Sequence, residues 1–402
     1  MRTRVSAIVL VVWLLASLGS PSARARQLET PDQPGTMAAM LARLPQSLPA
    51  AEPAGPPWGM IAYSDYAAQC AAVGVDPPAD RADPAQVDAW LRAVQQLPGW
   101  RLSDFAMTEA WEPAFGFSIF AVDQVVDVWA GDVHLMMLRG RFDPAAIRAA
   151  WQRNGYQVRE ATVVAGATVV SLGEDGSFDF GHPVQGMVID DANNAALLSD
   201  GTLIYTNTRA AMEAVLDVAA GVQRPLTESP LVAALLDVTR PDLAGAVFVP
   251  GTVVAADPFV TLLEGQQSGT DPGAAVASSV AESSRMPPLA VVFAGTTAGG
   301  PLPPPDDATP GPWEGPRAEG VIAAVVLTPA QAREAQTVIT SRLETQTSPD
   351  GHTPFTEMFP ERSVQTAPDL PIVVVSLGFA TDVAPGTLFR LLWSGGLSFL
   401  TW

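Results

Sequence analysis

The sequence contains no lysine, so all 22 of its basic residues are arginines. A chain without lysine cannot form a Schiff base, place a lysine on the phosphates of a nucleotide, or use a Ser-Lys catalytic pair. Pyridoxal-dependent enzymes and P-loop nucleotide hydrolases are therefore excluded as function classes.

Cysteine is almost absent as well. Cys70 is the single cysteine, so no disulfide can form within the chain. A chain of 402 residues is long enough to bury a core without such cross-links. Cys70 lies in residues 66–73, a stretch that predicts a helix, and we expect it to be a small buried core residue. The alternative, a reactive nucleophile, needs a histidine or a positive environment, and its sequence neighbours supply neither.

Histidine is scarce, and the three that occur are His134, His182 and His352. They are 48 and 170 residues apart in turn, which fits none of the spacings of known metal sites. The Gly-x-Ser-x-Gly motif of serine hydrolases and the Asp-Thr/Ser-Gly motif of aspartic proteases are missing too. We therefore predict no catalytic, cofactor-binding or metal-binding residue, and no cofactor.

The sequence around each histidine nevertheless indicates the environment that we expect for it. His134 lies in the apolar segment 133–138, which predicts a strand, and we expect a satisfied or edge-exposed strand residue rather than a catalytic group. His182 and His352 lie in predicted loops, where we expect them to be solvated. A site made from distant Ser, His and Asp residues, or from paired carboxylates, stays open because only the fold brings such groups together.

The chain has one long apolar run, at its N-terminus. Residues 5–18 follow Arg2 and Arg4, and Ala23-Arg24-Ala25 fits the pattern that signal peptidase cleaves. The run is shorter than the roughly 20 residues that a membrane-spanning helix needs. We predict that residues 1–25 are a signal peptide and that the protein is secreted or extracytoplasmic. An uncleaved N-terminal anchor is the alternative.

Acidic residues outnumber basic ones, which gives a formal charge of −20. Residues 1–25 hold three arginines and no acid, so the chain without them carries −23. A polyanion repels nucleic-acid phosphates and anionic lipid surfaces. We therefore expect no nucleic-acid partner, membrane contact only through an uncleaved N-terminal segment, and an unknown protein or small molecule as the partner.

The hydrophobic pattern predicts an α+β protein. A strand followed by a capped helix occurs twice, at 133–154 with Asp143-Pro144 and at 320–343 with Thr328-Pro329. This repetition predicts two loosely similar halves, each a mainly antiparallel sheet with helices packed on one face.

The predicted domain organisation follows from this pattern. The predicted segments are the signal peptide at 1–25, a Pro-rich lead at 26–57, the first half at 58–225 and the second half at 226–402, with a Gly/Pro-rich loop at 298–316.

Two groups of charged residues are candidates for a binding role. Carboxylates in 174–179 and 190–194 have oxygens that Ca²⁺ prefers, but the ligand order of an EF-hand is not met. A turn in which Asp and Asn bond their own backbone is the favoured interpretation of 190–194. We expect Arg139 and Arg141 to pair with neighbouring carboxylates such as Asp143.

Part of the chain, roughly residues 58–220, resembles a set of uncharacterised exported proteins from high-GC bacteria. The matching residues are Phe115-Gly116-Phe117, Val122-Asp123, Leu138-Arg139-Gly140-Arg141-Phe142-Asp143 and Gly155-Tyr156. The resemblance implies an extracytoplasmic location and no particular chemistry. The lipid-attachment cysteine of many such proteins is missing from this chain.

Together these observations favour an exported, non-enzymatic protein that binds a partner or ligand at or outside the cell surface. One alternative is an extracytoplasmic hydrolase whose carboxylate or Ser/His site forms only in the fold. Another is a structural or assembly accessory that docks through the loop at 298–316. A polar cleft with converging carboxylates favours the hydrolase, and a flat apolar patch favours the binder.

Overall fold

The computed structural model describes residues 36–47, 59–159, 164, 166–251, 286–303, 314–348 and 353–400. The predicted signal peptide, His352 and residues 304–313 of the Gly/Pro-rich loop lie outside these residues, as does most of the Pro-rich lead. Among the described helices, none combines the length and the apolar character that crossing a bilayer requires.

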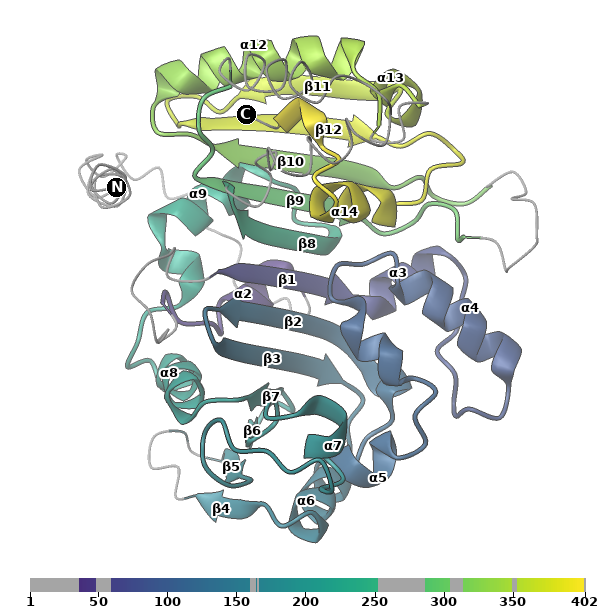
Figure 1. Ribbon diagram of the computed structural model, residues 1–402, viewed down its shortest axis with the longest axis vertical. Helices are drawn as coiled ribbons and strands as arrows, with labels where there is room; N and C mark the ends of the chain where they lie inside the picture. The colour runs from purple at the N-terminus through teal and green to yellow at the C-terminus, as the bar shows by residue number, and fades with distance from the viewer. Residues whose placement is uncertain are drawn as a thin grey trace, which may run out of the picture.

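Within the described residues, twelve strands form a single antiparallel sheet (Figure 1). Their order is β11-β12-β10-β9-β8-β1-β2-β3-β7-β6-β5-β4. The strands are β1 (Met60–Asp65), β2 (Val122–Ala130), β3 (Val133–Gly140), β4 (Gln157–Arg159), β5 (Thr168–Ser171), β6 (Asn194–Leu197), β7 (Leu203–Thr206), β8 (Leu243–Pro250), β9 (Val291–Thr297), β10 (Glu319–Val325), β11 (Glu361–Thr366) and β12 (Ile372–Gly378).

Helices and short 3₁₀ turns connect these strands. The helices are α2 (Met37–Leu41), α3 (Tyr66–Ala72), α4 (Pro84–Val94), α5 (Trp111–Phe115), α6 (Pro144–Arg153), α7 (Gln185–Val188), α8 (Arg209–Ala219), α9 (Pro230–Val238), α12 (Pro329–Thr345), α13 (Phe355–Met358) and α14 (Gly386–Trp393). The 3₁₀ turns are η1 (Trp100–Phe105), η2 (Ile119–Ala121), η3 (Leu226–Glu228) and η5 (Ser398–Leu400). The prediction of an α+β protein is confirmed.

The arrangement in two halves is not confirmed. β1 pairs with β8 in the middle of the sheet, with Ile61 opposite Phe248 and Tyr63 opposite Ala246, so the ladder crosses the predicted boundary without a break. One hydrophobic cluster also extends from Ile61 to Ile372 along one face. The two sides of the sheet are nevertheless similar in topology. Strands β1, β2 and β3 on one side, and β8, β9 and β10 on the other, lie next to one another in chain order. A helix then follows, α6 or α12, and the strands after it return from the outer edge until β7 pairs with β3 and β12 pairs with β10.

Helices cover both faces of the sheet rather than one. Side chains of α2, α8 and α9 pack on the face that carries the long cluster. The opposite face carries two clusters, one under α3 to α6 and one under α12 to α14. The central strands require both layers because their side chains are apolar in both directions, as in β8, where residues 243–249 are all buried.

The helix caps that the sequence predicts are present. The carboxylate of Asp143 accepts a hydrogen bond from Ala145 N at 2.8 Å, with Pro144 at the first helical position of α6. Thr328 caps α12 in the same way, with its hydroxyl accepting from Gln331 N at 3.2 Å.

The strand β2 was not expected from the pattern, because Asp123, Gln124 and Asp127 interrupt its apolar residues. Tertiary pairing decides its structure, since it lies between β1 and β3 and forms a ladder with each. This strand matters for the site because it carries Asp127 into the interior.

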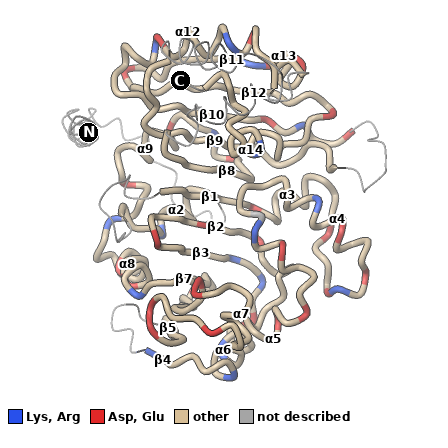
Figure 2. Tube along the Cα trace, viewed as in Figure 1, with Lys and Arg blue, Asp and Glu red and all other residues tan. Residues whose placement is uncertain are grey.

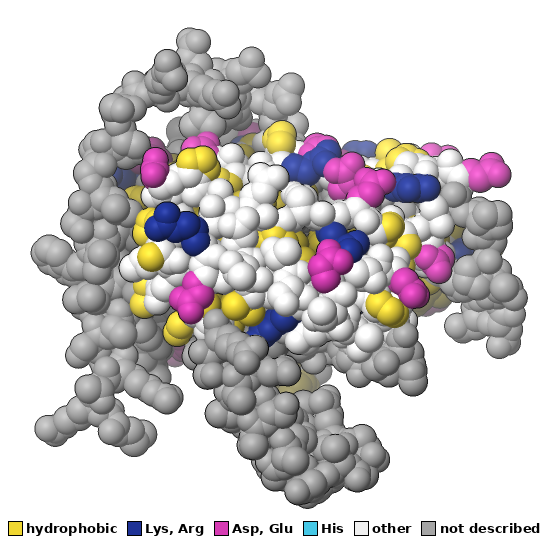
Figure 3. Space-filling view, turned by 90° about the horizontal axis from the view of Figure 1, so that it is seen from above, with side chains coloured by type: hydrophobic (Ala, Val, Ile, Leu, Met, Phe, Trp, Pro, Cys, Tyr) yellow, Lys and Arg dark blue, Asp and Glu magenta, His cyan; other side chains and the backbone are white. Residues whose placement is uncertain are grey.

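The surface shows mixed charge and few apolar side chains. On the face over α12 and β11, acidic and basic side chains alternate with single hydrophobic ones among the described residues (Figure 3). Phe178 and Phe180 are an exposed aromatic pair, since they are 54% and 70% exposed with ring centroids 5.0 Å apart. The apolar C-terminal segment docks onto the fold, with Leu388, Leu392 and Phe399 buried.

Candidate functional site

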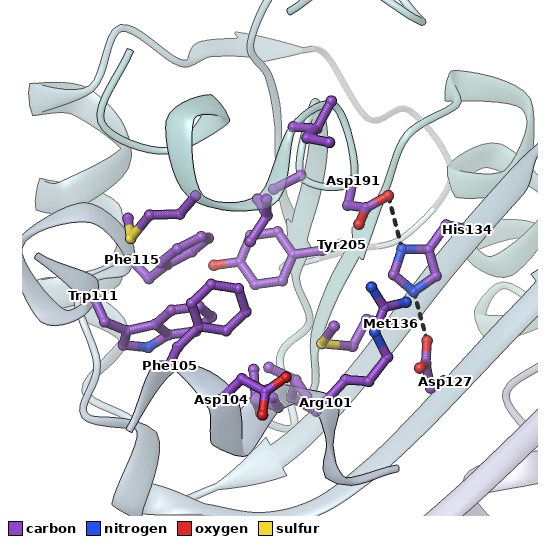
Figure 4. Close-up of a pocket in the computed structure, with 16 residues that line it drawn as sticks. Arg101, Asp104, Phe105, Trp111, Phe115, Asp127, His134, Met136, Asp191 and Tyr205 are labelled. Carbon is purple, nitrogen blue, oxygen red and sulfur yellow. Dashed lines mark hydrogen bonds and ion pairs between the residues drawn. The ribbon is translucent and has the colours of Figure 1, made fainter. Parts of the chain in front are cut away.

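A cavity of about 160 Å³ lies on the face of the sheet that α3 to α6 cover. Its floor consists of side chains from three neighbouring strands, namely Asp127 of β2, His134 and Met136 of β3, and Tyr205 of β7 (Figure 4). Alternation along a strand sends every second side chain to the same face. Met136 and Tyr205 stand opposite each other in the β3–β7 ladder, so both reach this floor.

Two aromatic elements form one wall. Arg101, Asp104 and Phe105 come from η1, while Trp111 and Phe115 come from α5. The Trp111 and Phe115 rings stack with centroids 4.1 Å apart, and Phe105 lies 5.1 Å from Trp111. This side of the cavity is therefore apolar and aromatic, with Arg101 and Asp104 exposed at its edge.

The segment 172–193, between β5 and β6, forms the other wall. Buried amide side chains fix it: Asn193 Oδ1 accepts from Gln185 Nε2 at 2.7 Å, and Asn193 Nδ2 donates to Ser177 O at 2.6 Å. Asn193 has no exposed surface. This network places α7 and Asp191 against the cavity.

His134 lies between two carboxylates in this cavity. Its Nε2 is 2.6 Å from Asp127 Oδ1 in a hydrogen bond, and its Nδ1 is 2.9 Å from Asp191 Oδ1 in an ion pair. The imidazole stacks on the Trp129 ring with centroids 3.8 Å apart. Asn207 Oδ1 accepts from His134 N at 3.0 Å, which holds the backbone as well. His134 is only 4% exposed, so the ring has little freedom to move.

The charge state of His134 follows from these contacts. Burial lowers the pKa of the imidazole, but Asp127 and Asp191 outweigh it and raise the pKa of His134 to about 9. The ring is therefore an imidazolium at neutral pH, with its Nε2–H donated to Asp127 and its Nδ1 in an ion pair with Asp191. It cannot accept a proton there, so the arrangement does not provide a general base.

Other titratable groups of the cavity are shifted by burial. Partial burial raises the pKa of Asp104, and Arg101 opposes the rise. Burial raises the pKa of the Tyr205 phenol, while Trp151 opposes the rise. Among the described residues that line the cavity, none is Ser, Thr, Cys or Lys, so the nucleophile types present are the Asp carboxylates, His134 and Tyr205.

The candidate residues from the sequence fall in different places. Cys70 is buried in the core as predicted, and burial raises the pKa of its thiol to about 12, so the thiolate is not formed at neutral pH. His182 lies outside the cavity, where its Nε2 donates to Asn154 O at 2.9 Å and its Nδ1 accepts from Val184 N at 3.2 Å. His134 is a buried strand residue, but its acidic partners were not foreseen.

The acidic groups also differ in detail from expectation. In 190–194 the side chains do not bond their own backbone: Asp191 reaches His134, and Asn194 Nδ2 donates to Asp175 Oδ1 at 3.0 Å. Within the described part of the chain, no group of three or more His, Cys, Asp or Glu could hold a metal ion. Arg141 pairs with Asp123 at 3.4 Å rather than with Asp143, because Asp143 caps α6.

Sequence reasoning missed the site because its members are far apart along the chain. Between Asp127 and Asp191 the chain passes through the end of β2 and then β3, α6, β4, β5 and α7. One local signal was present: Asp127 stands between Val126 and Val128 in an otherwise apolar stretch. A carboxylate inside a buried strand needs a partner, and such a partner is a candidate site residue.

No protein-family model matches the chain, and no curated protein matches it. A structural comparison finds the crystal form I structure of TP0453, with a TM-score of 0.32 and 8% sequence identity. The match covers 84% of this chain and 94% of that one. At this TM-score and identity, the likeness carries no inference about function.

Proposed function

We propose that this protein binds a small organic ligand in the cavity between β3 and segment 172–193, without transforming it. The observation that carries the proposal is the cavity itself, which combines an aromatic wall with a His134 held between Asp127 and Asp191. Its volume of about 160 Å³ is close to that of an engineered apolar cavity that binds benzene. A mostly apolar lining with a small number of well-placed polar groups is typical of ligand sites.

The proposal is tested with toluene as a probe, by saturation-transfer NMR on the full chain. We expect toluene to bind the wild type and to lose binding in Met136→Trp, because a larger ring on the floor fills the space. Met107→Trp is the matched control, since Met107 is 59% exposed and does not line the cavity. Binding that persists in Met136→Trp and in Met187→Trp would contradict the proposal.

A second candidate, an extracytoplasmic hydrolase, is favoured by one observation. Asp104, Asp127 and Asp191 converge on the cavity, and the pKa of Asp104 is raised, as a general acid requires. Asp127 and Asp191 are, however, both engaged by His134. Turnover of ester or glycoside test substrates that is abolished by Asp104→Asn would establish the hydrolase and overturn the binding proposal.

The binding role is proposed for a protein outside the cytoplasm. Residues 1–25 support this location by their arginines, apolar run and Ala-x-Ala site. N-terminal sequencing of the protein recovered from the culture medium or envelope is expected to show a start near residue 26. Recovery of the whole chain in the cytosol, beginning at Met1, would refute the location.

A further inference from the structure

We propose that the cavity selects a small organic cation, namely an ammonium group that carries an apolar part. This inference rests on the binding role proposed above and specifies its ligand. It is drawn from two features of the lining, which are its charge and its aromatic rings.

The lining carries more negative than positive charge. The lining contains three carboxylates (Asp104, Asp127 and Asp191) and two cations (Arg101 and His134). Its net charge is therefore −1 when all five groups are charged. Asp104 and Asp191 belong to different walls, and their carboxylates lie on two sides of the cavity in Figure 4. Asp191 uses Oδ1 for His134, and its side chain is 31% exposed, so it can also face a ligand. A cation placed here neutralises the surplus. The net charge of −20 on the chain further raises the local concentration of cations.

Aromatic rings line the same space. Phe105, Trp111, Phe115 and Tyr205 surround one side of the cavity. The faces of such rings attract organic ammonium groups, and the attraction is stronger where water is excluded. An inorganic cation gains less here, because it prefers a shell of oxygen ligands and the rings supply none. The lining therefore suits an organic cation better than a metal ion.

Arg101 favours the alternative, a negatively charged ligand. Its guanidinium is exposed and lies 5.0 Å above the Trp129 ring, and it could hold a carboxylate at the mouth of the cavity. The nearby Asp104 works against this, because the charges of Arg101 and Asp104 already interact. An anionic ligand is therefore an outcome that the experiment must be able to show.

Three probes of nearly equal shape separate these outcomes by isothermal titration calorimetry. Choline has the cationic head, 3,3-dimethylbutan-1-ol is its neutral isostere, and 3,3-dimethylbutanoate is an anion with the same apolar group. We expect choline to bind about tenfold more tightly than the alcohol, and the carboxylate to bind most weakly. Equal or tighter binding of the alcohol or the carboxylate overturns the inference.

Substitutions locate the effect in the cavity. Asp104→Asn is expected to weaken choline about three- to fivefold and to leave the alcohol unchanged. Phe105→Leu keeps an apolar side chain but removes the ring, so it is expected to weaken choline about threefold. Glu109→Gln is the control, because Glu109 is exposed and does not line the cavity. Equal loss in the control and in Asp104→Asn would contradict the site.

The two proposals fail in different ways. If toluene or the alcohol binds and Met136→Trp blocks it while choline does not bind, the cavity is a ligand site of another class and only this inference is wrong. If none of the probes binds, the binding role itself is wrong.

Discussion

His134 owes its properties to the neighbours that the fold gives it. Two carboxylates and the face of Trp129 make a normally titrating side chain a fixed positive charge. The sequence suggested a buried strand histidine, which the structure shows, but no spacing along the chain indicated Asp127 and Asp191 as partners. Partners that converge through sheet register and a remote loop are visible only once the strands are paired.

This charge makes stability depend on pH. The pKa of His134 is about 9 in the folded protein and about 6.5 in the unfolded chain. The contribution of protonated His134 to the free energy of unfolding is therefore fully present below pH 6.5 and is lost as the pH rises through 9. We expect the free energy of unfolding of the wild type to fall by roughly 2–3 kcal/mol over this range relative to His134→Gln.

Urea unfolding at several pH values between 6.5 and 9 measures this difference. His182→Gln is the matched control, because His182 lies outside the site and its ring contacts only backbone groups in the hydrogen bonds at Asn154 and Val184. Asp191→Asn provides a second variant, in which one carboxylate partner is lost and the dependence on pH should weaken. A difference between wild type and His134→Gln that grows toward pH 9 would have the wrong sign.

The elements range from readily predicted to unpredictable. α6 and α12 were expected from the sequence, because Asp143-Pro144 and Thr328-Pro329 are local capping signals. β2 was missed, because its polar residues break the pattern and only pairing with β1 and β3 makes it a strand. Segment 172–193 was read as loops with an acidic turn, and its function as a cavity wall depends on side-chain contacts between remote residues.

The amide network of segment 172–193 gives a prediction at this scale. Asn193→Ala removes the buried side-chain bonds to Gln185, Glu174 O and Ser177 O and leaves Gln185 Nε2 with only its bond to Ser177 O, which should cost about 1–3 kcal/mol of stability. It should also loosen Asp191 and weaken ligand binding. Urea unfolding checks the first effect, with the exposed Gln152→Ala as control. Equal stability of the two variants would show that the network does not hold the wall.

At the scale of the whole molecule, one sheet and one shared cluster join the two parts that the sequence suggested. β1 and β8 pair across the predicted boundary, and the cluster on one face contains residues from both sides. Figure 2 shows acidic residues distributed over the whole trace, including the loops around α7. The charge excess is thus a general property of the surface, while one of the three apolar clusters is continuous across the predicted boundary.

The unbroken sheet and the cluster shared by both sides predict that the described fold unfolds as one unit. Six of the ten tryptophans lie in residues 58–225, so tryptophan fluorescence reports mainly on the strands near the site, while far-ultraviolet circular dichroism reports on the whole chain. We expect the two urea transitions to coincide. A fluorescence transition that ends while the dichroism retains a second step would show two independent halves.

The charge state of His134 decides between a binding cavity and a catalytic one, and nitrogen-15 NMR of the histidine side chains measures it directly. The chain has three histidines, and His134→Gln assigns the relevant signal. Both ring nitrogens of His134 should be protonated at pH 7 and titrate near pH 9. A neutral ring at pH 7 that titrates near its ordinary value would restore a general base to the cavity and contradict the account.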